Sequence, residues 1–311
     1  MLTQEGNMRV IYRGDLDGIV SAAILMEVGL CDELVQAHPN DMQAGKVDVQ
    51  EGDIICNLPY HSNCGMWFDH HSSVIDSSAM PEEFTGLVEV APSAAGLVFK
   101  YFLPDHPGLS KYEQLVKETD LVDSADLTLD QVKNPEGAFL LGFLTDPQTG
   151  MGYQRDLNIS NFQWVSSLVD LLTKYSVEEV LDMPDSKERV NRYLEIQEVA
   201  TVFLSENSHL DGNVIVSDFL RKDILPANRF LIYTLDGLSE GNISVRISNG
   251  KAGEFDVISV GYSIFNKTSN VDCGALCASY GGGGHTAVAT CQPALDKSAE
   301  VFKEIIIACR E

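Results

Sequence analysis

Two short stretches that lie far apart in the chain contain aspartate and histidine, residue types whose side chains can bind divalent cations. The first is Gly14-Asp15-Leu16-Asp17-Gly18 and the second is Asp69-His70-His71. Two carboxylates one residue apart on a loop can converge on a hard cation, and they can equally serve as a helix N-cap and a turn residue. Asp-His-His can likewise be a strand end that carries polar side chains into solvent. The surrounding elements must decide between these roles.

Those elements are short predicted strands, each followed by polar residues. Apolar runs predict strands at 8–12, 34–37, 53–56 and 65–68, and helical apolar spacing covers 19–28. The four strand ends carry Gly14-Asp15-Leu16-Asp17-Gly18, His38-Pro39-Asn40-Asp41, Asn57-Leu58-Pro59 and Asp69-His70-His71. Strands that alternate with helices indicate a parallel sheet, and ligands bind beyond the carboxyl ends of such strands. Four polar strand ends therefore favour a metal site at that edge.

The middle of the chain predicts helices and ends in a long, charged one. Ala91-Pro92-Ser93 caps a helix that runs to about Phe102, and helical patterns follow at 111–122, 138–144, 161–174 and 187–208. The last of these is a natural spacer, with a boundary at Asp211-Gly212-Asn213. We therefore predict a first domain over 1–185, a linker helix over 186–211 and a second domain over 212–311.

The second domain is rich in short β runs and contains a glycine tract. The β runs are at 214–216, 230–233, 243–247 and 257–260, followed by a helix over 272–280, a strand near 287–291 and a closing helix from Lys297. Between that helix and strand lies Gly281-Gly282-Gly283-Gly284-His285. The tract can be a flexible loop, or its backbone N–H groups can surround an anion. Because ordered apolar segments flank it on both sides, we favour anion binding.

The charge and cysteine content limit the partners and the compartment. The net charge of the 311 residues is −25, and from Gly212 onward 9 basic residues face 11 acidic ones, against 12 and 35 before it. Such an acidic first domain argues against binding long duplex nucleic acid through a basic surface. Seven scattered cysteines indicate a reducing cytoplasm, no apolar run has the length of a membrane span, and the N-terminal residues lack a secretory pattern. We expect a cytoplasmic protein without a membrane partner.

Taken in order, Gly14-Asp15-Leu16-Asp17-Gly18, Asp69-His70-His71 and Gly281-Gly282-Gly283-Gly284-His285 make the chain resemble the DHH phosphoesterase family. It looks most like the branch with a DHH-associated C-terminal domain, which includes nanoRNases, RecJ-type exonucleases and exopolyphosphatase-like proteins. The resemblance implies an α/β fold: an N-terminal parallel-sheet DHH domain, a smaller C-terminal α/β domain and an active-site cleft between them. It also implies one or two Mn²⁺ ions, with Mg²⁺ as an alternative.

The resemblance also implies roles for individual residues. Metal ligands map onto Asp15, Asp17 and His70, and the last ligand can be Asp120, Asp123 or Asp146, of which we favour Asp123. Asp69 would orient the histidines and His71 would face the phosphate, as catalytic residues. The groups that would bind the substrate's far phosphate lie in the second domain: Arg246, Gly281, Gly282, Gly283, Gly284 and His285.

Two positions depart from the family pattern. The family usually has a histidine four residues before the first aspartate, where this chain has Ile11, and a bridging aspartate at the end of the third strand, where it has Asn57. A neutral amide is a poor ligand for a divalent ion and cannot offset charge between two metals. Either His38 or Asp41 compensates, or only one metal binds well, or activity is much reduced.

The expected activity is hydrolysis of a phosphodiester or phosphoanhydride by metal-activated water. Candidate substrates are a short oligonucleotide, 3′-phosphoadenosine phosphate, a cyclic dinucleotide and polyphosphate, and a homodimer is compatible with this activity. Two alternatives stay open. The first is a catalytically weakened nucleotide-binding regulatory module, and the second is a protein-interaction role of the acidic surface.

Overall fold

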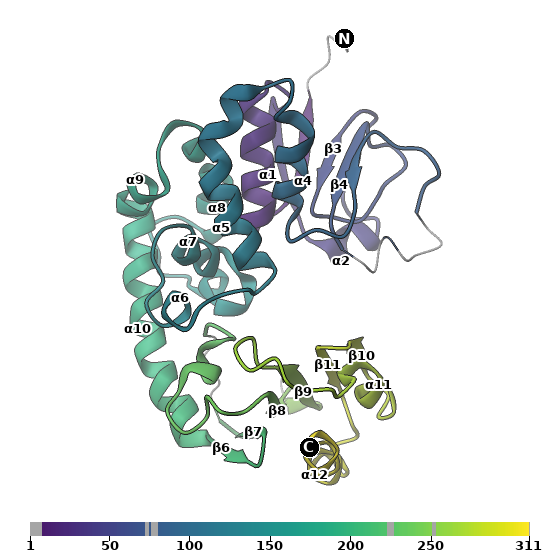
Figure 1. Ribbon diagram of the computed structural model, residues 1–311, viewed down its shortest axis with the longest axis vertical. Helices are drawn as coiled ribbons and strands as arrows, with labels where there is room; N and C mark the ends of the chain where they lie inside the picture. Colours follow the sequence, from purple (N-terminus) through teal and green to yellow (C-terminus); the bar gives the residue numbers. More distant parts are fainter. Residues whose placement is uncertain (1–7, 72–74, 76–79, 223–226, 251–252, 311) are drawn as a thin grey trace. The chain divides into compact units, whose positions relative to one another are not determined.

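The computed structural model describes residues 8–71, 75, 80–222, 227–250 and 253–310 (Figure 1). Contacts divide the chain into two compact units. The first comprises residues 1–126 and 135–193, and the second comprises 127–134 and 194–311. The long helix α10 (Pro184–Asn207) contributes to both units. The short helix α6 (Leu129–Lys133) belongs to the second unit although the first surrounds it in sequence.

The first unit is built on a parallel sheet of five strands in the order β2-β1-β3-β4-β5. The strands are β1 (Arg9–Arg13), β2 (Glu33–Ala37), β3 (Ile54–Cys56), β4 (Met66–Asp69) and β5 (Gly86–Val88). Because β1, β3 and β4 are neighbours, their carboxyl ends bring Asp15, Asn57 and Asp69 to one edge of the sheet. The predicted parallel sheet and the α/β class are confirmed.

Most helices of the first unit lie on one side of this sheet (Figure 1). The unit contains α1 (Leu16–Glu27), α2 (Pro39–Gln43), α4 (Ala94–Phe102), α5 (Glu113–Asp123), α7 (Gly137–Thr145), α8 (Asn161–Lys174) and α9 (Val177–Asp182), with 3-10 turns η1 (Pro107–Tyr112), η2 (Pro147–Thr149) and η3 (Met151–Tyr153). Helix α1 is buried along almost its whole length and packs against α4, α5 and α8. Its position is therefore fixed by the core on several sides, and so is the loop that precedes it.

The second unit is a mixed sheet of six strands in the order β10-β11-β9-β8-β7-β6. The strands are β6 (Ser208–Asp211), β7 (Val214–Phe219), β8 (Ile243–Asn249), β9 (Asp256–Tyr262), β10 (Gly283–His285) and β11 (Val288–Cys291). Alternate residues of β8 and β9, such as Val245 and Val260, are buried in one core with helices α11 (Cys273–Ala278) and α12 (Ser298–Cys309). The other face of the sheet carries the intervening residues of these strands.

Two local predictions for this unit are wrong. Residues 230–233 were predicted as a β run, but Leu231–Thr234 forms the 3-10 helix η4, because Asn228 accepts the N–H of Phe230 and starts a turn. The second half of the glycine tract is not a loop: Gly283, Gly284 and His285 form strand β10, paired with β11. The predicted boundary at 211–213 lies at the turn of the β6–β7 hairpin, where Gly212 has φ +64°.

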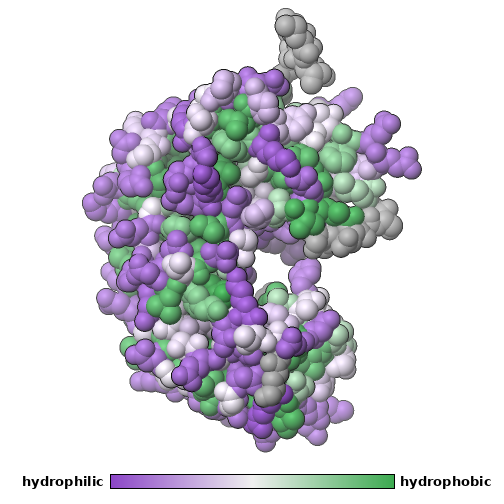
Figure 2. Space-filling model, in the orientation of Figure 1, coloured by the Kyte–Doolittle hydropathy of each residue, from purple (hydrophilic) through white to green (hydrophobic). Residues whose placement is uncertain are grey.

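Hydrophilic side chains cover much of the molecular face drawn in Figure 2, with hydrophobic areas scattered among them. This distribution agrees with the strong negative charge of the chain. In the parts of the chain that the structure describes, no helix has both the length and the apolar character needed to cross a membrane.

Candidate metal centre and substrate face

The loop between β1 and α1 packs closely at two glycines. A Cβ on Gly18 would lie 2.0 Å from the carbonyl oxygen of Arg13, and one on Gly14 would lie 2.1 Å from the side-chain nitrogen of Gln36. The backbone contact at Gly18 therefore requires glycine if helix α1 is to begin this close to the end of its strand, whereas the end of the Gln36 side chain can move away from a larger residue at position 14. Asp15 is the N-cap of α1, since its Oδ1 accepts the N–H of Gly18 at 3.1 Å.

Asp17 lies in the first turn of α1 and is 1% exposed. Its two carboxylate oxygens accept the backbone N–H groups of Ala94 at 3.0 Å and Ala95 at 2.6 Å, which open helix α4. The positive end of a helix dipole stabilises a carboxylate placed there. Ser93, the N-cap of α4, donates to Asp120 at 2.5 Å and thereby also ties this helix end to α5. Asp17 is thus fixed in orientation by an element 77 residues away.

His70 follows β4 and points one ring nitrogen at two carboxylates. Its Nδ1 lies 3.0 Å from the carbonyl oxygen of Ala91, so Nδ1 carries the proton in the neutral ring. Its Nε2 lies 3.2 Å from Oδ2 of Asp123 and 3.6 Å from Oδ2 of Asp17. Among the described residues, this buried Nε2 has no hydrogen-bond partner. An unprotonated nitrogen facing two carboxylates at these distances can share a cation with them.

The three residues fit one divalent ion. Asp17, His70 and Asp123 each offer a ligand atom, and these atoms all lie within 4.8 Å of one another. Carboxylate oxygens with one imidazole suit Mn²⁺, and carboxylates also suit Mg²⁺. Asp69, His70 and His71 form a second group of this kind, but Nδ1 of His71 is only 2.6 Å from Oδ1 of Asp69. That distance is a hydrogen bond rather than the separation of two ligands on one ion.

The electrostatics of the centre also call for a cation. Burial, followed by the nearby charges of Asp123 and Asp15, raises the pKa of Asp17 well above its ordinary value. Burial and the charge of Asp15 raise the pKa of Asp123 to about 6. Carboxylates crowded in this way oppose one another's ionisation, and a divalent ion relieves that repulsion.

His71 is held beside this cluster by Asp69, which is 1% exposed. Oδ1 of Asp69 also accepts the backbone N–H groups of His70 at 2.7 Å and His71 at 3.3 Å. The hydrogen bond to Asp69 raises the pKa of the His71 imidazole, although burial opposes the shift. The His71 side chain is 38% exposed, so its other nitrogen can meet a ligand from solvent.

The structure brings some predicted ligands together and separates others. Of the three candidates for the last acid, Asp123 reaches His70, Asp120 bonds to Ser93, and Asp146 caps η2 through the N–H of Gln148. Asp15 lies at the same strand end but is not in the three-residue group. Its Oδ2 pairs with Nε of Arg13 at 2.7 Å. The sequence reasoning missed Arg13, and its place two residues before Asp15 at the strand end was the available signal.

In the second unit, Arg246 lies on the face of the sheet opposite the helical core. Strand register places it in a row with Ser217 on β7, Ser259 on β9, Thr290 on β11 and Gly283 on β10. His285 occupies the next row of the same face, two residues along from Gly283. Three strand spacings separate Arg246 from β10, which is roughly 14 Å. This face, the candidate substrate face, therefore offers a cation and a histidine at its two sides, with two hydroxyls between them.

Steric fit explains two glycines of the tract. A Cβ on Gly282 would lie 2.1 Å from the carbonyl oxygen of Thr290, and one on Gly284 would lie 2.4 Å from that of Val288. Gly283 has open space around it. Gly282 and Gly284 are thus required for the close approach of β10 to β11. The residues of the tract and His285 are exposed to solvent.

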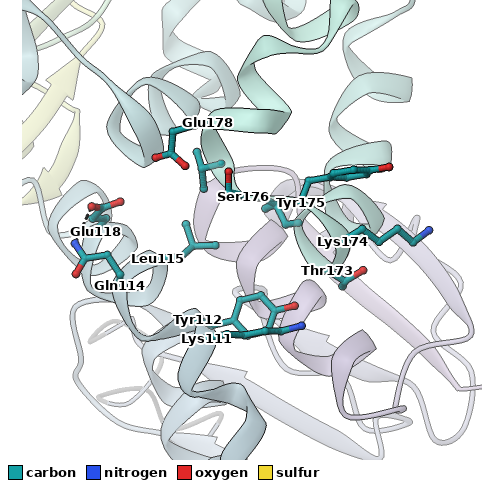
Figure 3. A pocket seen from close by; sticks show the side chains of 12 residues that line it. Lys111, Tyr112, Gln114, Leu115, Glu118, Thr173, Lys174, Tyr175, Ser176 and Glu178 are labelled. Atoms are coloured by element: carbon teal, nitrogen blue, oxygen red, sulfur yellow. Dashed lines mark hydrogen bonds between the residues drawn. The ribbon is translucent and has the colours of Figure 1, made fainter.

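A separate pocket of about 450 Å³ lies in the first unit between α5 and the junction of α8 with α9 (Figure 3). Glu118 and Gln114 line one side of it, and their side chains are hydrogen bonded at 2.8 Å. Its two lysines are engaged elsewhere, Lys111 with Glu27 and Lys174 with Asp170. The candidate metal ligands do not line this pocket, and we assign no function to it.

Comparison with known proteins found similar solved structures. A pGpG-specific phosphodiesterase, PggH, from Vibrio cholerae has 35% sequence identity and a TM-score of 0.84, over 96% of this chain and 98% of that one. An exopolyphosphatase-related protein from Bacteroides fragilis has 14% identity and a TM-score of 0.52, over 96% and 91% of the two chains. RecJ from Thermus thermophilus, in complex with Mn²⁺, has 13% identity and a TM-score of 0.59, over 97% of this chain and 52% of that one. The last two show a common fold.

No model of a protein family matches the sequence, and no curated protein matches it. The identity to the Vibrio cholerae enzyme over nearly the full length of both chains nevertheless shows the family, and it confirms the resemblance inferred from the Asp-His-His and glycine motifs. The chain belongs to the DHH family of phosphoesterases, which are metal-dependent hydrolases.

Proposed function

We propose that this protein is a Mn²⁺-dependent phosphodiesterase that cleaves short linear oligonucleotides, with the dinucleotide pGpG as the first candidate substrate. One observation carries the metal dependence: the buried Nε2 of His70 faces Asp17 and Asp123 with no hydrogen-bond partner in the described chain. The substrate assignment is supported by the 35% identity to a pGpG-specific phosphodiesterase. Mg²⁺ is the alternative ion.

Asp17, His70 and Asp123 would hold the ion. When bound there, a divalent ion lowers the pKa of a water molecule and offsets charge on the phosphoryl oxygens. The chain itself fixes the three ligands: helix α4 orients Asp17, the carbonyl of Ala91 orients His70, and Asp123 ends helix α5. Such preorganised ligands need little rearrangement during the reaction.

His71 would act on the leaving group. Because Asp69 accepts a hydrogen bond from Nδ1–H and thereby raises the imidazole pKa, His71 is more readily protonated at Nε2. In pGpG hydrolysis the water oxygen bonds to phosphorus, the bond from phosphorus to the 3′ oxygen breaks, and that oxygen takes up a proton. His71 can donate this proton, and the products are two molecules of GMP.

The substrate face of the second unit supports a dinucleotide rather than a single phosphate. Arg246 and the β10 strand lie roughly 14 Å apart across the sheet, which exceeds the span of one phosphate group. Arg246 can bind a phosphate through its planar guanidinium, and Ser259 and Thr290 add hydroxyl groups between the two sides.

The test is a hydrolysis assay with the full chain and Mn²⁺. Candidate substrates are pGpG, cyclic di-GMP, 3′-phosphoadenosine phosphate and polyphosphate, with products separated by chromatography. We expect GMP from pGpG, loss of turnover on chelation, and at least a hundredfold loss in Asp17→Asn. Unchanged turnover in Asp17→Asn would contradict the site. Tight binding of Mn²⁺ and pGpG without any product would favour the regulatory module instead.

A further inference from the structure

The departures at Ile11 and Asn57 raise the question of how many ions this centre holds. Resting on the proposed function, we infer that the centre binds a single divalent ion and that Arg13 supplies the second positive charge at the phosphate. Asp15, the acid that would bind a second ion, is already paired with Arg13, whose Nε lies 2.7 Å from its Oδ2.

The carboxylate of Asp15 has three donors around it. Besides Arg13 on Oδ2, its Oδ1 accepts the N–H of Gly18 at 3.1 Å and the side-chain N–H of Asn57 at 3.1 Å. A carboxylate has about four lone-pair directions, so one remains for a metal. The guanidinium also neutralises the charge that would attract the ion. Asp15 is therefore a poor ligand, unlike Asp17, which has no ion pair with a lysine or arginine among the described residues.

The other two positions provide no anionic ligand. Ile11 is 0% exposed and contributes only hydrocarbon to the core between β2 and β3. Asn57 is 1% exposed, with φ +55°, and turns its amide nitrogen toward Asp15. The reversed amide would set its oxygen against Oδ1 of Asp15, so this contact fixes the orientation. The amide oxygen has no hydrogen-bond partner among the described residues, so it can offer one neutral ligand atom, but it lacks the negative charge with which a carboxylate bridges two divalent ions.

The two residues that could compensate are used elsewhere. Nδ1 of His38 accepts the N–H of Asn40 and caps α2, which leaves the proton of the neutral ring on Nε2. Asp41 pairs with Lys46 at 3.2 Å, and its side chain is 47% exposed. Among the described residues, neither side chain belongs to a group of three that could share an ion. These contacts therefore do not support the possibility that His38 or Asp41 compensates for the ligands missing at Ile11 and Asn57.

Arg13 is placed to replace the missing positive charge. It is the last residue of β1, two residues before Asp15, and its Nε reaches Oδ2 of Asp15 at 2.7 Å. Its positive charge therefore lies at the strand end that carries the ligand cluster. Its side chain is 33% exposed and can therefore meet a ligand. A guanidinium has five N–H donors in a fork that matches phosphate, and Nε alone accounts for the contact with Asp15. Arg13 can thus hold Asp15 and a phosphate oxygen together.

The test is the Mn²⁺ stoichiometry of the metal-free full chain, measured by equilibrium dialysis and by electron paramagnetic resonance. We expect one ion per chain, with the hyperfine pattern of an isolated Mn²⁺. Two tightly bound ions, or a spin-coupled pair, would overturn the inference while leaving the proposed function intact. No bound ion would contradict the proposed function itself, so the two failures are distinguishable.

Variants test separately the two parts of the inference, namely the single bound ion and the positive charge that Arg13 supplies. Asn57→Asp keeps the size of the side chain, and we expect it to bind a second Mn²⁺ ion; a stoichiometry of one would remove Asn57 from the explanation. Asp41→Asn is the control and should leave the wild-type value unchanged. Arg13→Ala should still bind one ion but lose about a hundredfold in turnover, with little recovery in Arg13→Lys. Full turnover in Arg13→Ala would overturn the role of Arg13.

Discussion

Replacing Asp123 with asparagine should stabilise the metal-free protein while it destroys the metal site. Asp123 ends helix α5, where the helix dipole disfavours a negative charge, and its side chain is only 27% exposed. Burial and the charge of Asp15 raise its pKa from 3.8 to about 6. The shift of about two units corresponds to about 3 kcal/mol of unfolding free energy at pH 7.5. Asparagine has the same shape without this cost.

The pH dependence follows from the direction of the shift. A raised carboxyl pKa means that the folded state keeps its proton to higher pH than the unfolded state does. The associated stability is therefore present below pH 4 and is lost as the pH rises through about 6. The advantage of Asp123→Asn should accordingly be largest at pH 7.5, roughly halve near pH 5, fall to about 0.5 kcal/mol near pH 4 and vanish at lower pH.

Tryptophan fluorescence in a urea titration measures this change in the first unit alone. Trp67 and Trp164, the two tryptophans of the chain, are both buried there. The wild type and Asp123→Asn should be compared in chelator and again with excess Mn²⁺. The added Mn²⁺ should stabilise only the wild type. Asp41→Asn, at an exposed ion pair, should change stability by less than about 0.5 kcal/mol. A metal-free Asp123→Asn protein less stable than the wild type at pH 7.5 would refute the reasoning.

Three further predictions concern the ion, the glycine tract and the substrate face. Mn²⁺ at a fixed concentration, a hundred times the dissociation constant measured at pH 7.5, should stabilise the first unit by about 2.7 kcal/mol at that pH. The same concentration should stabilise it less at pH 5, because protons compete with Mn²⁺ for the buried carboxylates of Asp17 and Asp123. Equal stabilisation at both pH values would argue against these two residues as ligands. Gly282→Ala should destabilise the β10–β11 hairpin by about 1–3 kcal/mol in hydrogen exchange, because its Cβ meets Thr290, whereas Gly283→Ala, with open space, serves as the neutral control. Arg246→Ala should raise the KM for pGpG at least tenfold without changing Mn²⁺ affinity in titration calorimetry, and an unchanged KM would argue against the substrate face.

The strand ends were predictable because two local signals agree there. Short apolar runs mark β1, β3 and β4, and polar residues follow each of them. Parallel strands end at one edge, so the meeting of Asp17 with His70 follows from topology. The choice of Asp123 as the last acid came from the family resemblance, and only the path of helix α5 brings it to His70.

Contacts distant in sequence were not predictable. The N-terminus of α4 holds Asp17, and the sequence shows a capped helix at Ser93 without showing where that helix begins in space. The pairing of Arg13 and Asn57 with Asp15 likewise depends on the register of β1 with β3. Side-chain hydrogen bonds of this kind depend on tertiary packing, which local patterns do not encode.

The two errors in the second unit have local causes. The run at 230–233 is apolar throughout, so neither alternation nor helical spacing distinguishes strand from turn, and the Asn228 side chain decides it. Glycine has low strand propensity, so strand β10 was hidden in the tract. Its glycines are required by close approach to Thr290 and Val288, a constraint that appears only once β11 is in place.

The most direct test of the central claim is a crystal of the full chain grown with Mn²⁺ and measured for anomalous scattering from manganese. We predict one strong peak within bonding distance of Nε2 of His70 and of the carboxylates of Asp17 and Asp123. A map with no peak at Nε2 of His70, or with manganese bound only elsewhere, would contradict the claim that these three residues form the metal centre.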